Sequence, residues 1–124
     1  MPPTANISEA EWEVMEILWR KSPLTALEVV RQLNHKAWKD QTIRTMLGRL
    51  VRKKVLTYRA DGKLYHYRPL VTRDHCVRVE SHSFLHRIFR GAPQPLLVHM
   101  VQDAKLSRED IAELRRLLAK KEKK

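Results

Sequence analysis

Apolar residues recur at helical spacing in three segments of the first half of the chain, and short polar stretches separate these segments. Two of the segments open with a capping box, in which Ser8 or Thr25 is followed three residues later by Glu11 or Glu28. Such a box marks the start of a helix when an apolar periodicity follows it. The pattern therefore predicts three consecutive helices, over residues 8–21, 25–34 and 40–54.

The periodicity changes after residue 54. Residues 55–59 and 63–68 are rich in β-branched and aromatic side chains, and they flank Ala60-Asp61-Gly62. Asp-Gly between two such runs is a strong hairpin signal, because glycine tolerates a positive φ. Three helices followed by a two-stranded hairpin predict a winged helix-turn-helix.

Helical spacing returns in the second half of the chain. We predict helices over residues 72–89, 95–104 and 107–120, the last of which opens with a weaker capping box. The expected fold is therefore mainly α with a small β-hairpin wing. A winged-helix DNA-binding domain over residues 1–70 precedes a helical dimerisation domain over residues 71–124.

Charge is concentrated in one part of the chain. The sequence carries 25 Lys and Arg against 14 Asp and Glu, a net charge of +11 with a pI of about 10.2. Residues 36–68 hold ten basic and two acidic residues, whereas residues 8–19 hold four Glu and no Lys or Arg. A basic segment that coincides with a helix-turn-helix pattern favours a polyanionic partner, and double-stranded DNA before any other.

Other classes of protein fit the composition less well. No apolar run approaches the ~20 residues of a spanning helix, so we expect no membrane insertion, and Trp12 and Trp19 lie beside acidic residues that an anionic membrane surface would repel. The first residues lack the pattern of a signal peptide. A single cysteine, Cys76, fits a reducing, cytoplasmic setting. The sequence contains no recognisable catalytic set, Gly-rich phosphate loop or metal motif, so we expect no enzyme and no cofactor.

The helix predicted over residues 40–54 is the second of the helix-turn-helix pair, which in this class lies in the major groove. Gln can bond adenine, Arg can bond guanine, and the Thr methyl group can contact thymine. At the start of the helix, which reaches base edges most easily, the candidate base-reading residues are Gln41, Thr42, Arg44 and Thr45. The candidate contacts to the phosphate backbone are Arg49, Arg52, Lys53, Lys54, Arg59 and Lys63.

Two features of the same segment allow more than one interpretation. A glycine inside a helix, such as Gly48, lowers helix stability by ~1 kcal/mol relative to Ala. A close approach to DNA phosphates or to another helix would explain why a glycine stands at this position. Tyr58, Tyr65 and Tyr67 lie in the hairpin, where cross-strand packing is favoured. Stacking of these rings on single-stranded bases is the alternative.

The helices after residue 71 are too few to bury their own apolar faces well. A two-fold dimer doubles the contacts that one winged helix makes with a palindrome, so we expect a core shared by two copies. An intramolecular core is the alternative. The candidate dimerisation residues are Phe84, Leu85, Ile88, Phe89, Leu96, Leu97, Met100, Leu114, Leu117 and Leu118.

Three histidines fall on one face of the helix predicted over residues 72–89. They are His75, His82 and His86, of which the last two have the i, i+4 spacing that a metal can use. A metal-responsive repressor that uses these three residues is therefore an alternative. The other interpretation is a polar, partly exposed face near the dimer interface.

Six short runs of residues are shared with a known family. They are Ile7 to Met15 (I-S-E-A-E-W-E-V-M), Leu18-Trp19, Thr42 to Thr45 (T-I-R-T), Arg49-Leu50, Tyr65 to Tyr67 and Ile111 to Arg115. Together they extend over nearly the whole chain and resemble the penicillinase repressor family (BlaI/MecI type). The resemblance implies a homodimeric repressor that binds palindromic operators through its winged helix and dimerises through its C-terminal helices. On this resemblance, Thr42, Arg44 and Thr45 are recognition-helix contacts.

The chain departs from the patterns of the family's members in two respects. The resemblance implies inactivation at an Asn-Phe bond after a membrane-embedded sensor protease detects β-lactam. The similar stretch here is Leu97 to Val101, with His99-Met100 as the candidate cleavage site. Copper-responsive relatives carry paired C-x-C motifs, whereas this chain has only Cys76. We therefore expect a sequence-specific repressor, with a non-specific nucleic-acid-binding protein as the other hypothesis.

Overall fold

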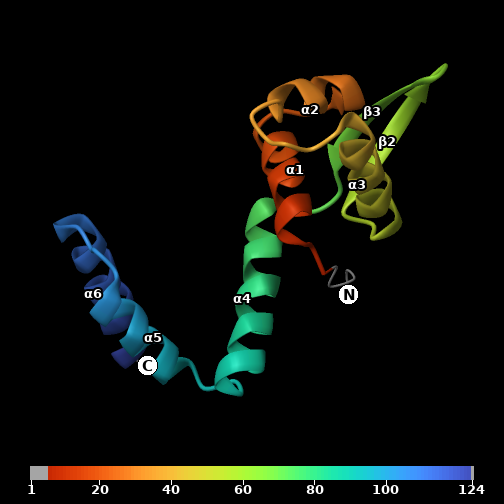
Figure 1. Ribbon diagram of the computed structural model, residues 1–124. Coiled ribbons are helices and arrows are strands. Elements are labelled where there is room, and N and C mark those ends of the chain that lie inside the picture. The colour runs from red at the N-terminus through yellow and green to blue at the C-terminus, as the bar shows by residue number, and fades with distance from the viewer. Residues whose placement is uncertain (1–5, 124) are drawn as a thin grey trace. The chain divides into compact units, whose positions relative to one another are not determined.

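The computed structural model describes residues 6–123, and the chain divides into two compact units. The N-terminal unit is Met1–Glu80 and the C-terminal unit is Ser81–Lys124. In chain order the elements are α1 (Glu9–Arg20), β1 (Leu24–Thr25), α2 (Ala26–Gln32), α3 (Asp40–Arg52), β2 (Leu56–Asp61), β3 (Leu64–Pro69), α4 (Arg73–Phe89), α5 (Pro93–Asp103) and α6 (Arg108–Glu122) (Figure 1). The predicted mainly α fold with a small β-hairpin wing is confirmed.

Three helices begin at the capping boxes in the sequence. At α1, the Ser8 hydroxyl accepts a hydrogen bond from the Glu11 backbone N–H (3.1 Å), and the Ser8 N–H donates to the Glu11 carboxylate (2.9 Å). The same reciprocal bonds open α2 and α6. They satisfy backbone donors that the first turn of a helix leaves free, so each predicted start is confirmed.

A three-stranded antiparallel sheet with the order β1-β3-β2 packs beside these helices. The predicted hairpin is confirmed, but its turn lies one residue later than expected. Asp61 pairs with Leu64, so Gly62 and Lys63 form the turn. Gly62 has a φ of +62°, as the first position of a type II′ turn requires. The short strand β1 has too few residues to show an alternating pattern, so the sequence did not predict it.

The N-terminal unit closes over one hydrophobic core. Fully buried side chains from three helices meet there: Val14 and Leu18 of α1, Val29 of α2, and Leu47 and Leu50 of α3. At the edge of this core, Trp12 packs edge-on against Trp19, with ring centroids 5.2 Å apart. The helix-turn-helix and the base of the hairpin are therefore held in a fixed arrangement by common packing.

The first turns of α4 belong to the N-terminal unit. The indole N–H of Trp19 donates to the Val71 carbonyl (3.0 Å), and Arg73 makes two bonds to the Glu16 carboxylate (2.8 and 3.2 Å). Cys76 is 6% exposed and joins the core. Because of these contacts, the compact unit extends to Glu80, beyond the domain boundary expected at residue 70.

The C-terminal unit consists of helices without a closed core. Arg90 (φ +53°) and Gly91 (φ +85°) turn the chain between α4 and α5. The ring of Phe89 lies 6.1 Å from that of Phe84 and 6.4 Å from that of His99. Within residues 6–123, every buried residue lies in the N-terminal unit. Over the same range, no helix is both long and apolar enough to cross a membrane.

Candidate nucleic-acid interface

Helix α3 presents a polar face because its apolar residues point inward. Ile43, Met46, Leu47 and Leu50 are at most 3% exposed, which leaves the other positions of the helix towards solvent. All of the candidate base-reading residues are exposed: Gln41, Thr42, Arg44 and Thr45. The structure thus brings these four side chains together on the accessible surface at the start of α3.

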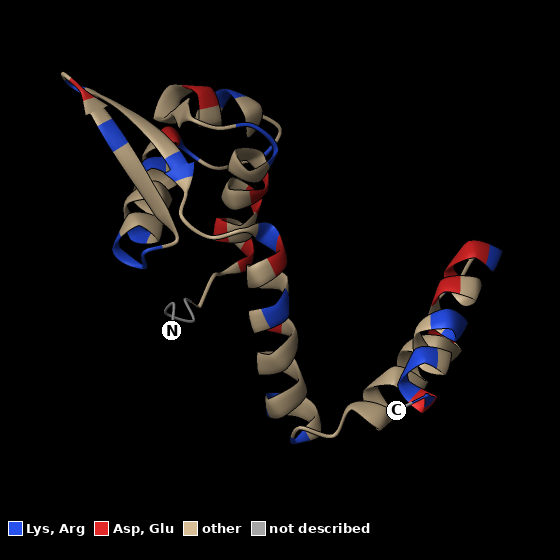
Figure 2. Ribbon diagram, turned by 180° about the vertical axis from the view of Figure 1, so that it is seen from behind, with Lys and Arg blue, Asp and Glu red and all other residues tan. Residues whose placement is uncertain are grey.

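Basic side chains continue from α3 onto the hairpin. Arg52 and Lys54 are exposed at the end of α3, and Arg59 and Lys63 are exposed on the hairpin. Figure 2 shows basic positions along α3 and the hairpin and acidic positions along α1. A surface with this distribution of charge attracts a polyanion, and contacts to phosphates would fix its orientation without reading sequence.

Two other predicted contacts to DNA phosphates, Lys53 and Arg49, lie next to a buried carboxylate. Lys53 Nζ donates to Glu11 Oε1 (2.6 Å) and to the Asn6 carbonyl oxygen (2.7 Å). Arg49 Nη1 lies 4.0 Å from Glu11 Oε2, and the Arg49 side chain is 53% exposed. The ammonium group of Lys53 is therefore engaged within the N-terminal unit, whereas the guanidinium of Arg49 reaches solvent.

Glu11 is the residue that the sequence analysis missed. The sequence pattern gives Glu11 only a capping bond, yet its side chain is 1% exposed. Burial alone raises the pKa of Glu11, but hydrogen bonds from Lys53 and Ser8 outweigh burial and hold that pKa below its ordinary value of 4.5. The helical spacing of Glu11 with Val14 and Leu18 already placed it on the buried face of α1, and this signal was available in the sequence.

The tyrosines of the hairpin pack on one another across the strands, as predicted. Tyr58 and Tyr65 stack with ring centroids 4.2 Å apart, and Tyr58 lies opposite Tyr67 with centroids 5.9 Å apart. Burial raises the pKa of Tyr67, the neighbouring tyrosines raise it further, and Arg44 opposes them. Cross-strand packing accounts for the positions of these rings without a single-stranded partner.

Gly48 is not explained by crowding within the chain. A Cβ atom at this position would meet Arg52 Nη1 at 3.7 Å, an ordinary van der Waals contact, and no other helix of the described chain comes near. Of the two explanations for this glycine, close approach to another helix of the same chain is therefore wrong. Close approach to DNA phosphates stays a prediction.

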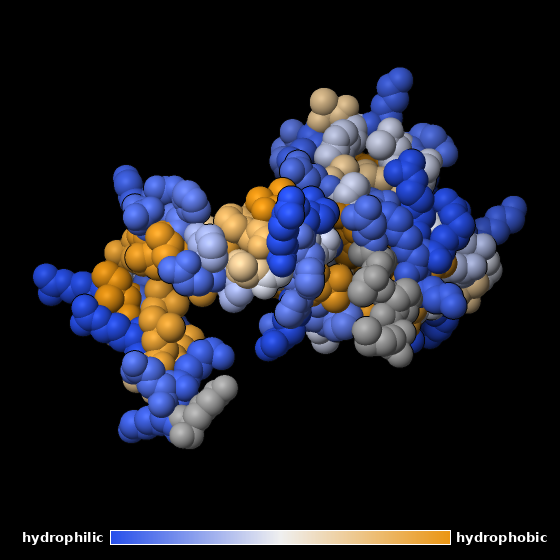
Figure 3. All heavy atoms as spheres, turned by 90° about the horizontal axis from the view of Figure 1, so that it is seen from below, coloured by the Kyte–Doolittle hydropathy of each residue, from blue (hydrophilic) through white to orange (hydrophobic). Residues whose placement is uncertain are grey.

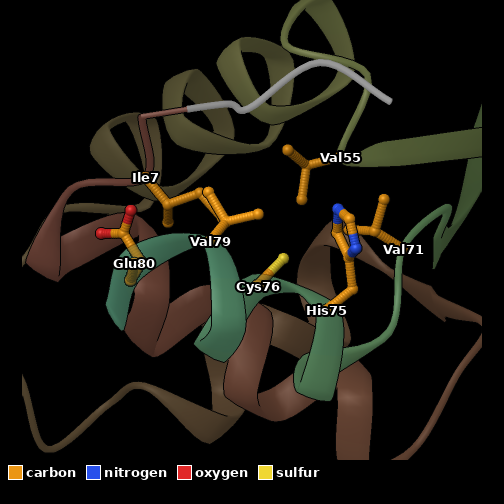
Figure 4. A pocket seen from close by; sticks show the side chains of 7 residues that line it. All are labelled: Ile7, Val55, Val71, His75, Cys76, Val79 and Glu80. Carbon is orange, nitrogen blue, oxygen red and sulfur yellow. The ribbon is translucent and has the colours of Figure 1, made fainter. Parts of the chain in front are cut away.

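A small apolar pocket lies where the start of α4 meets the base of the hairpin (Figure 4). Its walls are formed by Ile7, Val55, Val71, His75, Cys76, Val79 and Glu80. Burial raises the pKa of the Cys76 thiol, and nearby Glu80 raises it further, which favours the thiol over the nucleophilic thiolate. His75 Nε2 is buried there without a hydrogen-bond partner in the described part of the chain.

The metal-binding alternative is not supported by the positions of its ligands. His75 lines the pocket just described, whereas His82 and His86 are exposed on later turns of α4. Between residues 6 and 123, no three His, Cys, Asp or Glu side chains come together in a way that could hold a metal ion. The histidines share a helix face in the sequence pattern, but the structure does not gather them into a site.

The candidate dimerisation residues form an accessible apolar surface on the C-terminal unit. Leu85, Phe89 and Leu96 are partly buried. The others are 39–60% exposed, namely Phe84, Ile88, Leu97, Met100, Leu114, Leu117 and Leu118. Figure 3 shows hydrophobic side chains gathered over these helices. Contiguous exposed apolar surface of this kind marks interaction sites on proteins.

The candidate cleavage bond, His99–Met100, lies within α5, and both side chains are exposed. The backbone groups of a helix interior are bonded along the helix. A protease that binds its substrate in an extended conformation therefore requires α5 to unwind locally before it can cut there.

Known proteins resemble this chain along nearly its whole length. The family model described as penicillinase repressor matches residues 7–120. The penicillinase repressor of Bacillus licheniformis is 35% identical over 114 residues, which cover 91% of this chain and 89% of that relative. The methicillin resistance regulatory protein MecI of Staphylococcus aureus (strain N315) is 34% identical over 119 residues, which cover 95% of this chain and 97% of MecI.

Two solved structures resemble part of the chain. The DNA-binding domain of the repressor BlaI matches with 35% identity and a TM-score of 0.54, over 59% of this chain and 90% of that one. The monomeric form of Bacillus licheniformis BlaI in complex with the blaP half-operator matches with 35% identity and a TM-score of 0.52, over 60% of this chain and 92% of that one. With the family model matched over almost all of its length, this chain belongs to the penicillinase repressor family of winged-helix transcriptional repressors.

Proposed function

We propose that this chain is a sequence-specific repressor that binds operator DNA through α3 and the β2–β3 hairpin. The observation that carries the proposal is the exposed polar face of α3, with exposed basic side chains at its end and on the hairpin. The solved complex of BlaI with a half-operator supports it, since that protein is 35% identical to this chain over the matched region. An α-helix fits the major groove, where the donors and acceptors of each base pair form a distinct pattern.

The proposed roles separate reading from positioning. Gln41, Thr42, Arg44 and Thr45 read base edges, because they lie at the exposed start of α3 and carry the groups that pair with bases. The proposed phosphate contacts are Arg49, Arg52, Lys54, Arg59 and Lys63. We no longer assign Lys53 a phosphate contact, because its ammonium group already pairs with the buried carboxylate of Glu11.

Footprinting of the purified protein on the DNA upstream of its own gene tests this function. We expect one bounded protected segment whose two halves are related by two-fold symmetry, and its protection should survive an excess of random duplex. Protection that spreads evenly along the DNA and disappears with random competitor would instead favour a non-specific nucleic-acid-binding protein.

We infer that two copies of the chain pair through the C-terminal unit. The support is the apolar surface over α4, α5 and α6, where side chains such as Ile88 and Leu118 are 57% and 60% exposed. Burying a fully exposed Leu or Ile side chain yields about 1.5–3 kcal/mol, and each of these half-exposed side chains would contribute part of that. A two-fold dimer also presents one α3 to each half of a palindrome. Sedimentation equilibrium tests this, and a monomer at concentrations that saturate DNA would contradict it.

Release by a membrane sensor protease, which the family resemblance implies, stays a prediction. Such a mechanism acts on a repressor in the cytoplasm, where the operator lies. Cleavage at His99–Met100 requires local unwinding of α5, so a substitution of Val101 by Gly, which weakens the helix without changing the bond, should speed cutting there by the sensor protease. Fragment masses from cells exposed to β-lactam would identify the bond that is cut.

A further inference from the structure

The buried carboxylate of Glu11 joins α1 to α3 through two cations. Glu11 Oε1 accepts from the Ser8 N–H (2.9 Å) and from Lys53 Nζ (2.6 Å). Glu11 Oε2 is buried as well and has no hydrogen-bond partner among the described atoms. Arg49 Nη1 lies 4.0 Å from this second oxygen, just beyond the length of a hydrogen bond.

A buried carboxylate oxygen without a donor is unfavourable, so a small movement of Arg49 towards Glu11 is favoured. The Arg49 side chain is 53% exposed and free to make that movement. Its guanidinium is a planar fork with five donors, so one edge can bond the carboxylate while the other edge remains free. Lys53 is already engaged, because its ammonium donates both to Glu11 Oε1 and to the Asn6 carbonyl oxygen.

An open hollow lies beside Arg49, between α1 and α3. Arg49 lines this hollow together with Gln41, Thr42 and Thr45 on the exposed side of α3 and Ser8 at the start of α1. Three of these side chains, Ser8, Thr42 and Thr45, carry hydroxyl groups that can donate to an anion. The charges of Glu11, Lys53 and Arg49 sum to one positive charge, so the carboxylate at the base of this arrangement does not make it repel a phosphate.

We propose that Glu11 is a positioning residue of the DNA-binding face, which holds Arg49 in the hollow between α1 and α3 so that its guanidinium meets one backbone phosphate of the duplex. This inference rests on the proposed function, because it needs α3 to lie against DNA. It assigns different roles to the two neighbouring cations. Lys53 neutralises the buried carboxylate, and Arg49 carries the phosphate contact.

The direction in which DNA affinity changes when the Glu11 charge is removed distinguishes a positioning role of Glu11 from a purely electrostatic one. A carboxylate that acted only through its charge would repel DNA, so its removal would tighten binding. A carboxylate that positions Arg49 gives the opposite result. Glu11→Gln is isosteric and keeps an acceptor oxygen for the Ser8 N–H, so it removes the charge with little change of shape.

The experiment measures the affinity of the full chain for a fluorescent duplex of random sequence over a series of salt concentrations. A random duplex is the appropriate probe, because a phosphate contact does not depend on sequence. We expect Glu11→Gln to weaken binding roughly tenfold, the effect of one charge-assisted hydrogen bond. The slope of log K against log salt should fall by about 0.9, the value for one phosphate.

Arg49→Ala should reproduce both effects, and the double variant should lose little more, because both changes remove the same contact. Glu16→Gln is the matched control. It also removes a carboxylate from α1, but Glu16 pairs with Arg73 at the start of α4 (2.8 Å) rather than with α3. This variant should leave the salt slope unchanged.

Equal or tighter binding by a folded Glu11→Gln variant would overturn the proposal, and so would additive losses in the double variant. If circular dichroism shows that Glu11→Gln does not fold, Arg49→Ala alone tests the proposal. An unchanged salt slope in Arg49→Ala would mean that Arg49 makes no phosphate contact, so that Glu11 has none to position, and this would overturn the proposal. A wild-type chain that binds no duplex would instead overturn the proposed function, and this inference with it.

Discussion

The two units of the chain carry similar apolar side chains, but only the N-terminal unit closes over them. Leu47 and Leu50 on α3 are fully buried, whereas Leu117 and Leu118 on α6 are 47% and 60% exposed. All four are leucines in amphipathic helices, so the difference comes from their surroundings. Around α3, helices and a sheet share one core. The N-terminal unit is complete within one chain, and the C-terminal unit carries a surface suited to a partner.

Polar contacts differ between the two units in the same way. In the N-terminal unit, Glu11 pairs with Lys53 and Glu16 pairs with Arg73, so ion pairs connect α1 to distant elements. In the C-terminal unit, the ion pair between Glu113 and Arg116 is a local i, i+3 contact on one helix. Contacts of the first kind fix tertiary structure, whereas the second kind supports a single helix.

The largest expected effect is on the stability of the N-terminal core. Leu47→Ala should lower the free energy of unfolding by about 2–5 kcal/mol, because it leaves a cavity among fully buried side chains. Leu117→Ala removes the same atoms from an exposed position and should leave the urea transition of the N-terminal unit unchanged. Equal shifts in both variants would remove the contrast between the units.

The next effect concerns assembly through the C-terminal unit. Leu118→Glu places a charge in the apolar surface of α6 and forfeits part of the about 1.5–3 kcal/mol that full burial of a leucine yields, once for each copy in the proposed dimer. Sedimentation equilibrium should then show dissociation into monomers. Ala119→Glu adds the same charge one residue away, off the apolar stripe of α6, and should leave the dimer intact. A dimer that survives Leu118→Glu would show that this surface is not the interface.

Acid should weaken the N-terminal unit through Glu11. Its pKa in the folded chain lies below the ordinary value of 4.5, so folding disfavours protonation of this carboxyl group. Its stabilising contribution is fully present above pH 4.5 and is lost as the pH falls through the lower folded pKa.

Urea unfolding at a series of pH values measures this loss. The wild type should lose about 1.5–3 kcal/mol more than Glu11→Gln on acidification, the magnitude of a hydrogen bond to a charged group. Glu16 and Glu28, whose pKa values are also lowered, are present in both proteins and cancel in the comparison. Parallel pH profiles would exclude Glu11 as the source of the acid sensitivity.

The smallest effect is expected at Gly48. Gly48→Ala should raise the stability of the N-terminal unit by up to about 1 kcal/mol, because alanine favours the helix and its Cβ meets only an ordinary contact. If the helix approaches DNA closely here, the same variant should bind a duplex less tightly despite being more stable. Unchanged affinity would leave the glycine without a role at the interface.

Local features of the fold followed from the sequence, and long-range features did not. The starts of α1, α2 and α6 are set by bonds between residues three positions apart, so a capping box reveals them. The strand β1 forms only because Leu24 and Thr25 pair with Tyr67 and His66, and no local pattern contains that information.

The candidate interface shows the same limit. Helical spacing was enough to predict that the polar residues between Gln41 and Thr45 are exposed at the start of α3, because burial of one helix face leaves the opposite face in solvent. The role of Lys53 could not be predicted from its charge. Its partner Glu11 lies 42 residues away in sequence, and only the packing of α1 on α3 brings the two together.

The central claim is that α3 reads sequence while the hairpin positions the protein on DNA. The most direct test compares the affinities of wild type, Arg44→Ala and Lys63→Ala for the footprinted operator and for a random duplex. Arg44→Ala should reduce the preference for operator by about 1–3 kcal/mol, whereas Lys63→Ala should weaken both complexes alike and lower the salt slope by about 1. If both variants changed the preference equally, or if only Lys63→Ala changed it, the claim would be wrong.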